Sequence, residues 1–380
     1  MTPPARLGDN IAAVDTPALV IDLDAMERNL ARMATFARNH RVRLRPHAKM
    51  HKSAELARLQ MAHGAVGVCV QKTAEAEALA AGGVNNIYIS NEVIAPAKLA
   101  RVAALALRLQ HDGGQLAIAV DSEHGIAALA DAMHHAHGAH IDVFIDVDIG
   151  HGRCGVPPGD PALALARAIA PHRTLRLVGL HAYHGAAQHQ RDSGTRQATL
   201  ARSAQMVRET RDLLIRHGFG PLLVTGAGTG TYALETASGL WGELQTGSYL
   251  FMDADYASNQ HTADPPAFEH ALFVKAQVVS RQGDRAVCDA GHKSHAIDSG
   301  LPTVWAPAGL TFANGGDEHG VLRAATPATP LPAIGDTVWL IPGHCDPTVN
   351  LHDWLVGVRG GLQQGFVERL IRVDARGALT

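Results

Sequence analysis

The sequence of 380 residues has little lysine, little cysteine and no long apolar run. Only six of its 33 basic residues are lysine, and its four cysteines lie far apart without a CxxC pair. This spacing excludes a disulfide framework and a cysteine-rich zinc knuckle, and it is typical of a reducing compartment. The lack of 18 consecutive apolar residues and of an apolar N-terminal segment argues against a membrane span or a secretory signal. We therefore expect a cytoplasmic protein.

The charge balance argues against two further classes of partner. The formal net charge is −3, so neither nucleic acid binding nor a polybasic membrane contact is expected. Apolar residues make up 46 % of the chain, which is enough to form a large core. The short supply of lysine also means that few residues are candidates for lysine chemistry.

Between residues 40 and 250, short β-branched runs alternate with alanine- and leucine-rich helical stretches. Such alternation indicates parallel βαβ units, and eight of them favour a closed (β/α)8 barrel over an open doubly wound sheet. The predicted strands are residues 42–46, 66–70, 87–90, 116–120, 141–147, 175–180, 222–225 and 242–246.

The pattern changes after residue 265, where strand-like runs are separated by Gly, Pro and Asp turns and no helix is expected. We predict a barrel domain over residues 23–265 and an all-β domain over residues 266–380, with an N-terminal strand from residues 1–22 added to the latter. The pair Pro265-Pro266 is the expected hinge. A helix is expected to begin near Asp24, with Asp24 and Glu27 as a capping pair.

Polar side chains follow the predicted strands directly, at the face where barrel enzymes hold their catalytic groups. The run TGAGTG at residues 225–230 follows the seventh strand, and Gly247 and Ser248 follow the eighth. Bare backbone N–H groups in these loops favour an anion site, although a tight turn without a ligand is the alternative. The run lacks the GxGxxG spacing of a dinucleotide site.

Lys49 lies at the end of the first predicted strand, in the run RPHAKMHK at residues 45–52. A lysine opposite a phosphate site in a barrel suggests pyridoxal phosphate. Neighbouring cations and partial burial are expected to lower the pKa of Lys49, and a neutral amine is what covalent attachment of the cofactor requires. The alternative is a surface lysine in a basic loop.

These residues, together with further motifs, resemble one family. The further motifs are CVQK at residues 69–72, GRCG at 152–155, AYHG at 182–185, QTGSY at 245–249, MDADY at 252–256, DEHG at 317–320 and PGHCDP at 342–347. Together they resemble the metal-activated D-threonine aldolases, which include 3-hydroxy-D-aspartate aldolase and are related to D-serine dehydratase. The resemblance implies a pyridoxal-phosphate enzyme with an alanine-racemase-like barrel, a homodimer, and a β-hydroxy-D-amino acid substrate.

The resemblance also implies roles for individual residues. Lys49 would hold the cofactor, Arg153 would face its pyridine nitrogen, and His344 and Asp346 would bind a divalent metal. The remaining cofactor contacts would be Gln71, Tyr183, Thr225, Gly228, Thr229, Gly247, Ser248 and Tyr256.

His344 and Asp346 are also a plausible metal pair by spacing. They are two apart after a predicted strand, so in extended chain both side chains point one way and Cys345 points the other. One imidazole and one carboxylate leave positions open, which suits Mn²⁺, Mg²⁺ or Co²⁺. Related dehydratases are expected to carry cysteine at the position of Asp346, so the aspartate favours aldol cleavage.

The function implied is cleavage of a β-hydroxy-D-α-amino acid to glycine and an aldehyde. His184, His47 and His319 are candidates for proton transfer, and for each of them a structural hydrogen bond is an equal alternative. Three alternatives to the aldolase function stay open: dehydration of D-serine or 3-hydroxyaspartate, a non-catalytic pyridoxal-phosphate carrier, and a metalloenzyme without the cofactor.

Overall fold

The computed structural model describes residues 2–260 and 267–380. Its first unit is a ring of eight parallel strands in the order β2-β9-β8-β7-β6-β5-β4-β3. The ends of this order are joined by a parallel bridge between His47 and Cys69 and by a 2.8 Å hydrogen bond from Val66 N to Leu44 O. The strands are β2 Arg43–Leu44, β3 Val68–Val70, β4 Asn86–Ile89, β5 Gln115–Val120, β6 Ile141–Asp146, β7 Leu175–Ala182, β8 Leu223–Gly226 and β9 Glu243–Leu244. Each of the eight predicted strands overlaps one of these, so the barrel prediction is confirmed.

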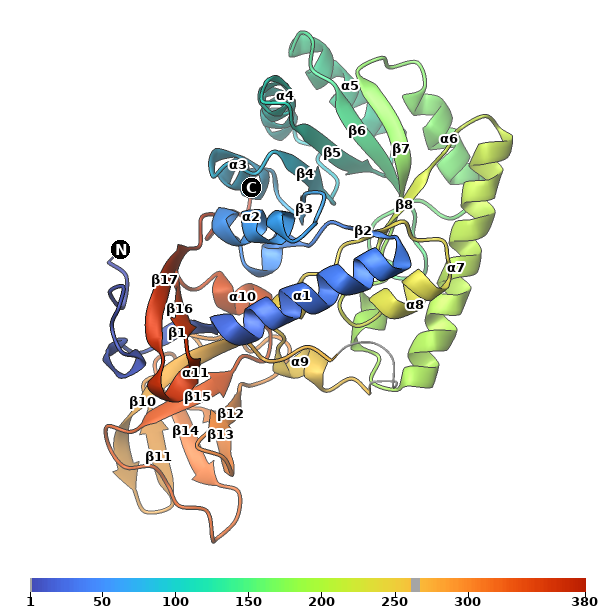
Figure 1. Ribbon diagram of the computed structural model, residues 1–380. Coiled ribbons are helices and arrows are strands. Elements are labelled where there is room, and N and C mark those ends of the chain that lie inside the picture. The colour runs from blue at the N-terminus through green and yellow to red at the C-terminus, as the bar shows by residue number, and fades with distance from the viewer. Residues whose placement is uncertain (1, 261–266) are drawn as a thin grey trace.

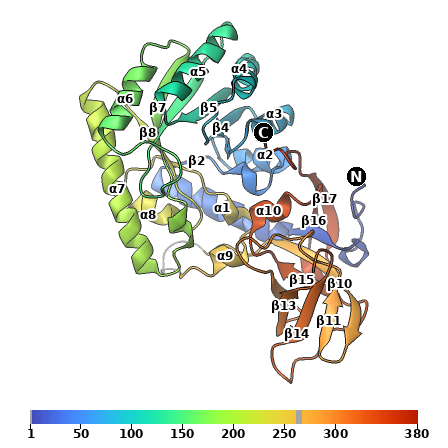
Figure 2. The same cartoon turned by 180° about the vertical axis from the view of Figure 1, so that it is seen from behind.

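Helices cover the outside of the ring in both views (Figures 1 and 2). They bury alanine and leucine against the strands, and both residues favour helix. The helices are α1 Leu23–His40, α2 Ala54–Ala62, α3 Thr73–Ala81, α4 Pro96–His111, α5 Glu123–His135, α6 Asp160–Ile169, α7 Ser193–Arg216 and the short α8 Tyr232–Ala237. None of the helices in the described residues is long and apolar enough to cross a membrane.

The start of α1 differs by one residue from the prediction, and its cap is a different residue. The side chain of Asp22, not Asp24, accepts a hydrogen bond from Ala25 N and caps the helix. Asp24 and Glu27 instead form ion pairs with Arg359 at 2.8 and 2.7 Å. These carboxylates tie the first helix to the second unit of the fold.

The second unit is a nine-stranded sheet in which the N-terminal strand is central. β1 pairs antiparallel with β10 and parallel with β16, so residues 18–22 join a sheet made otherwise from the last 110 residues. Its strands are β1 Ala18–Asp22, β10 Leu272–Gln282, β11 Arg285–Cys288, β12 Thr303–Ala306, β13 Leu310–Asn314, β14 Gly320–Ala324, β15 Thr337–Ile341, β16 Trp354–Arg359 and β17 Phe366–Arg372.

Two short helices interrupt this unit, contrary to the expectation of none. They are α10 Cys345–Val349 and α11 Gly361–Gln364, and β13 is a further strand that the pattern does not predict. Pro347 does not prevent α10, because the first turn of a helix needs no N–H at that position. In both views α10 lies between the barrel and the sheet (Figures 1 and 2). The predicted hinge at Pro265-Pro266 lies outside the described residues.

Candidate active site

A cavity of about 260 Å³ opens at the carboxyl ends of the barrel strands, where α10 faces them. Most of the residues predicted for the site line this one cavity, although they come from distant parts of the chain. Those residues are His47, Lys49, Gln71, Arg153, Tyr183, Gly228, Thr229, Gly247, Ser248, Tyr256, His344 and Asp346.

Lys49 lies in the 3₁₀ turn η2 Ala48–Met50, directly after β2, and its side chain is 42 % exposed. Its Nζ lies 2.8 Å from Oδ2 of Asp346, and this carboxylate raises the pKa of Lys49. The expectation of a lowered pKa for Lys49 is therefore wrong. The neighbouring cation Lys52 does not act on Lys49 as expected, because it pairs with Glu75 at 2.8 Å.

The glycine-rich loop after β8 and the turn after β9 form the wall expected to bind phosphate. Within residues 2–260 and 267–380, the backbone N–H groups of Thr229, Gly247 and Ser248 donate to no protein acceptor. A Cβ on Gly228 would lie 2.4 Å from Oε1 of the buried Gln188, so a side chain there would force Gln188 or the loop to shift. Free N–H groups on a glycine-rich loop suit an anion such as a phosphate.

His47 and Gln71 form a polar cluster at another wall of the cavity. Nε2 of Gln71 lies 3.0 Å from Nε2 of His47 and 3.1 Å from Oγ of Ser90. Burial, reinforced by Lys49, lowers the pKa of His47 well below its usual range, so this imidazole is neutral. With its ring nitrogens already engaged, His47 is better suited to shaping the cavity than to moving protons.

His344 and Asp346 face each other across 3.9 Å, measured from Nε2 to Oδ1. Oδ1 of Asp346 is buried and has no hydrogen-bond partner among the described residues. Burial raises the pKa of Asp346, but Lys49 and His344 outweigh it and lower that pKa to about 2. An ionised carboxylate oxygen without a partner, beside an imidazole nitrogen, is the environment that a divalent cation completes. The residues therefore fit a metal.

The side chains of His344 and Asp346 lie close together, but not through the extended backbone that their spacing in sequence suggests. His344 is extended with φ −144° and ψ 126°, but Asp346 lies in the first turn of α10. Cys345 points elsewhere, with Sγ 3.5 Å from Met252 O. The buried carboxylate of Asp253 fixes this turn, because Oδ2 accepts from Cys345 N at 3.1 Å and Oδ1 accepts from Tyr256 N at 2.9 Å.

The cavity also contains residues for which the sequence predicts no individual role. His189 lines it, and Nδ1 of His189 lies 2.5 Å from Oδ2 of Asp255, a buried carboxylate that also pairs with Arg191. No sequence signal links this pair, since the two residues are 66 positions apart. His181 and Gln245 line the cavity as well and contact each other at 3.2 Å. Their positions at the ends of predicted strands could have indicated them.

Three predicted residues lie outside the cavity. His184 is buried and accepts a hydrogen bond from Ala187 N through Nδ1 at 3.2 Å, which organises its own loop. Thr225 is bonded inside the barrel to Glu243 at 2.9 Å. His319 is exposed at the start of β14, in the β domain, and does not line the cavity of its own chain.

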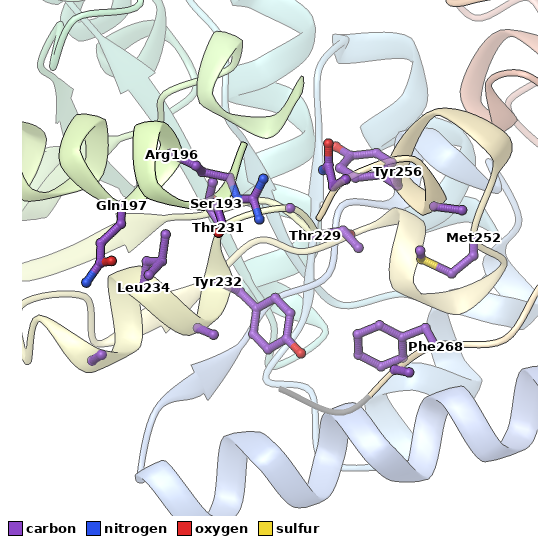
Figure 3. A pocket seen from close by; sticks show the side chains of 16 residues that line it. Ser193, Arg196, Gln197, Thr229, Thr231, Tyr232, Leu234, Met252, Tyr256 and Phe268 are labelled. Atoms are coloured by element: carbon purple, nitrogen blue, oxygen red, sulfur yellow. The ribbon is translucent and has the colours of Figure 1, made fainter. Parts of the chain in front are cut away.

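A second cavity of about 270 Å³ lies behind the glycine-rich loop and shares Thr229 and Tyr256 with the first. Figure 3 shows the rings of Tyr232 and Phe268 side by side at this cavity, and their centroids are 6.0 Å apart. Among the described residues, its lining has no lysine, histidine or carboxylate. The reactive groups therefore belong to the first cavity.

The chain is similar to proteins of known activity over its full length. The family model described as "Alanine racemase, N-terminal domain" matches residues 21–255, and the one described as "Putative serine dehydratase domain" matches residues 271–358. D-threonine aldolase from Arthrobacter sp. is 44 % identical, with 99 % of this chain and 97 % of that protein covered. 3-hydroxy-D-aspartate aldolase from Paracoccus denitrificans is 41 % identical, with 98 % and 95 % covered.

The fold agrees with these matches. A crystal structure of D-threonine aldolase from Filomicrobium marinum superposes with a TM-score of 0.95 at 48 % identity and covers all of both chains. D-threo-3-hydroxyaspartate dehydratase from Delftia sp. is more distant, at 32 % identity with 90 % of this chain and 93 % of that protein covered.

Proposed function

Because this chain belongs to the family of alanine-racemase-like enzymes that includes D-threonine aldolase, we propose that it cleaves β-hydroxy-D-α-amino acids to glycine and an aldehyde. The observation that carries the proposal is the meeting of Lys49, from the barrel, with His344 and Asp346, from the β domain, in one cavity. Aldol cleavage needs a cofactor site and a hydroxyl-activating site side by side, and the roles proposed for these residues would supply both in one cavity.

We propose that pyridoxal phosphate is held covalently by Nζ of Lys49, with its phosphate at Gly228, Thr229, Gly247 and Ser248. Gln71, Tyr183 and Tyr256 line the same cavity, and Arg153 would face the pyridine nitrogen. The bound cofactor supplies the electron sink for the carbanion that remains when the Cα–Cβ bond breaks.

His344 and Asp346 would hold a divalent ion of the Mn²⁺, Mg²⁺ or Co²⁺ class, whose role is to lower the pKa of the substrate β-hydroxyl. His189 is the group that we propose accepts the hydroxyl proton. Asp255 fixes Nδ1 of this imidazole, so Nε2 is the nitrogen with a free lone pair. Loss of that proton forms the aldehyde carbonyl at Cβ, and the electrons of the broken bond pass to Cα.

Dehydration is the competing function, because the β domain matches a serine dehydratase model. In that reaction the β-hydroxyl leaves instead of Cα–Cβ breaking, and the products are a keto acid and ammonia. The carboxylate at Asp346 and the higher identity to the aldolases favour cleavage.

A product assay tests the proposal. D-threonine, D-phenylserine, 3-hydroxy-D-aspartate and D-serine would be incubated with the enzyme with and without Mn²⁺. From D-threonine, D-phenylserine and 3-hydroxy-D-aspartate, which have a carbon beyond Cβ, we expect glycine plus the matching aldehyde. H344A and D346A should lose this activity but keep the absorption band of the cofactor. Ammonia without glycine from every substrate would exclude the aldolase function.

A spectroscopic assay tests the role of Lys49. The purified enzyme should show the visible absorption of a lysine-bound cofactor, and borohydride should bleach it. K49A should lack this band. An unchanged spectrum in K49A would exclude Lys49 as the attachment point.

The assembly and location of the enzyme are also proposals. Family membership supports a homodimer. The four cysteines are all free, which is consistent with a reducing compartment such as the cytoplasm.

A further inference from the structure

The carboxylate of Asp298 lies beside the metal pair without belonging to any of the motifs described above. Its Oδ2 is 2.7 Å from Nδ1 of His344, whereas Nε2 of the same ring faces Asp346 at 3.9 Å. The two nitrogens of the imidazole therefore have different neighbours, one at the metal pair and one at Asp298.

This contact determines which nitrogen of His344 can bind a metal. A carboxylate accepts hydrogen bonds, so the neutral ring places its proton on Nδ1 and leaves the lone pair on Nε2. Ser299 Oγ, at 3.4 Å from Nδ1, is a weaker second partner. Metal-binding histidines commonly donate their other N–H to a carboxylate, which fixes the ring and raises its basicity.

The loop that carries Asp298 is anchored to the ligand helix itself. Thr348 Oγ1 donates to His344 O at 2.7 Å and accepts from Ala296 N at 3.0 Å, so it joins the two segments. A Cβ on Gly343 would lie 2.2 Å from Gly300 O, which shows how closely the two backbones approach. Asp298 is therefore held in place by the same contacts that hold His344.

We propose that Asp298 is a positioning residue for the metal site: it fixes the Nδ1–H tautomer and the ring orientation of His344 and thereby raises the affinity for the divalent ion. It acts through His344 and contacts neither substrate nor metal. The inference depends on the proposed metal role of His344 and Asp346, and its test measures metal affinity rather than turnover.

The test is a titration of metal-free holoenzyme with Mn²⁺, in which free Mn²⁺ is followed by electron paramagnetic resonance. For D298A we expect an affinity about tenfold lower, at the weak end of the roughly 10–100-fold range for such carboxylates. The weak end is expected because the Asp298 side chain is 51 % exposed and water can partly replace it. In D298N the amide oxygen still accepts a hydrogen bond from Nδ1–H of His344. The Mn²⁺ affinity of D298N should therefore lie between those of D298A and the wild type.

D284N provides a matched control, because Asp284 is 78 % exposed and its nearest cation is Arg323 at 3.7 Å. It removes the same charge from the β domain and should keep wild-type affinity, and the cofactor band should be unchanged in all these variants. Wild-type affinity in D298A, or an equal loss in D284N, would overturn the inference. Wild-type affinity in H344A would instead overturn the metal site itself, so the two failures are distinguishable.

Discussion

The role proposed for His189 in proton transfer rests on its surroundings in the fold and not on a sequence motif. The chain has 23 histidines, but among the described residues only His47, His181, His189 and His344 line the cavity. Burial lowers the pKa of His181 to about 4 and that of His47 well below its usual range. His344 belongs to the metal pair. This leaves His189, with its side chain 46 % exposed and Asp255 behind it, as the imidazole best placed to exchange a proton.

The first prediction concerns that proton transfer. H189Q should lower kcat by about 10²–10⁴-fold, the range for loss of a general base, while the cofactor band and Mn²⁺ affinity stay unchanged. D255N should lower kcat less, because it leaves the imidazole in place and weakens its orientation, and it also removes the ion pair with Arg191. H184Q is the comparison: it should lower the Tm, since His184 is bonded to Ala187 N, and leave kcat within a few-fold of the wild type. A kcat for H189Q equal to that of H184Q would argue against the role.

The second prediction concerns Glu235, which lies 1 % exposed in α8 with no cation partner among the described residues. Burial raises the pKa of Glu235 from 4.5 to about 8. The folded state thus binds the proton more tightly than the unfolded state. The stabilising contribution is complete below pH 4.5, falls between pH 4.5 and 8, and is lost above pH 8. This difference between the pKa of Glu235 in the unfolded and folded states corresponds to roughly 4–5 kcal/mol.

Thermal unfolding of the holoenzyme at pH 6 and pH 8.5 measures this effect. Between pH 6 and pH 8.5, the Tm of E235Q should fall by less than the Tm of the wild type. E209Q, which alters a glutamate exposed on α7, should behave like the wild type. An identical fall in Tm for E235Q and the wild type would show that Glu235 does not ionise in this interval.

The loop between β8 and α8 is held in place by the buried side chain of Gln188. Gln188 is fully buried; its Oε1 accepts from Gly230 N at 3.0 Å and its Nε2 donates to Thr231 Oγ1 at 2.7 Å. These bonds hold the loop so that Thr229 N stays free of protein acceptors in the described chain. The side chain of Gln188 cannot move away from an added methyl group without losing both bonds.

The third prediction follows from that packing. G228A should weaken cofactor binding, because its Cβ would approach Gln188 Oε1 to 2.4 Å and the loop must shift at a cost of about 1–3 kcal/mol. Dialysis followed by the absorbance of retained cofactor measures the loss. G194A is the control: its Cβ would meet only Asp192 Oδ1, at an ordinary 3.5 Å. Equal retention of cofactor in the two variants would contradict the packing argument.

At the scale of the whole molecule, the candidate active site lies where two units of the fold meet. Lys49 follows the first barrel strand and Asp346 lies in the first turn of α10 of the β domain, yet their charges are 2.8 Å apart. Arg359 reinforces the junction on another side by pairing with Asp24, Glu27 and Glu368. A substitution of Lys49 should therefore change the electrostatic environment of Asp346 in the β domain.

The fourth prediction uses this coupling between the cofactor and metal sites. The Lys49 ammonium lies 2.8 Å from the Asp346 carboxylate, so a divalent ion bound at Asp346 must compete with this ammonium. Covalent attachment of the cofactor engages Nζ, so the holoenzyme should bind Mn²⁺ more tightly than the cofactor-free protein, by about tenfold if the pair contributes about 1.4 kcal/mol. Cofactor-free K49A should bind Mn²⁺ more tightly than the cofactor-free wild type. Equal affinity in all forms would exclude the competition.

The sequence by itself determined the barrel, because the eight strands and their helices are encoded in local hydrophobic periodicity. It also indicated most of the cavity, since the ends of parallel strands must meet at one face. The position of Lys49 after the first strand, opposite the glycine-rich loop, already indicated this residue, and motif resemblance added the pair His344 and Asp346. The short helix α10 was missed, because its beginning coincides with the metal motif and its proline suggests a turn.

Only the tertiary structure decided what each polar group faces. The pKa of Lys49 depends on Asp346, which is 297 positions away in sequence, and the orientation of His189 depends on Asp255. His184 and Thr225 lie at strand ends, as predicted, but their side chains turn to hydrogen bonds inside the protein. Electrostatic and hydrogen-bonding effects act through space over a few ångströms, so local sequence can place a residue on the correct face without fixing its partner.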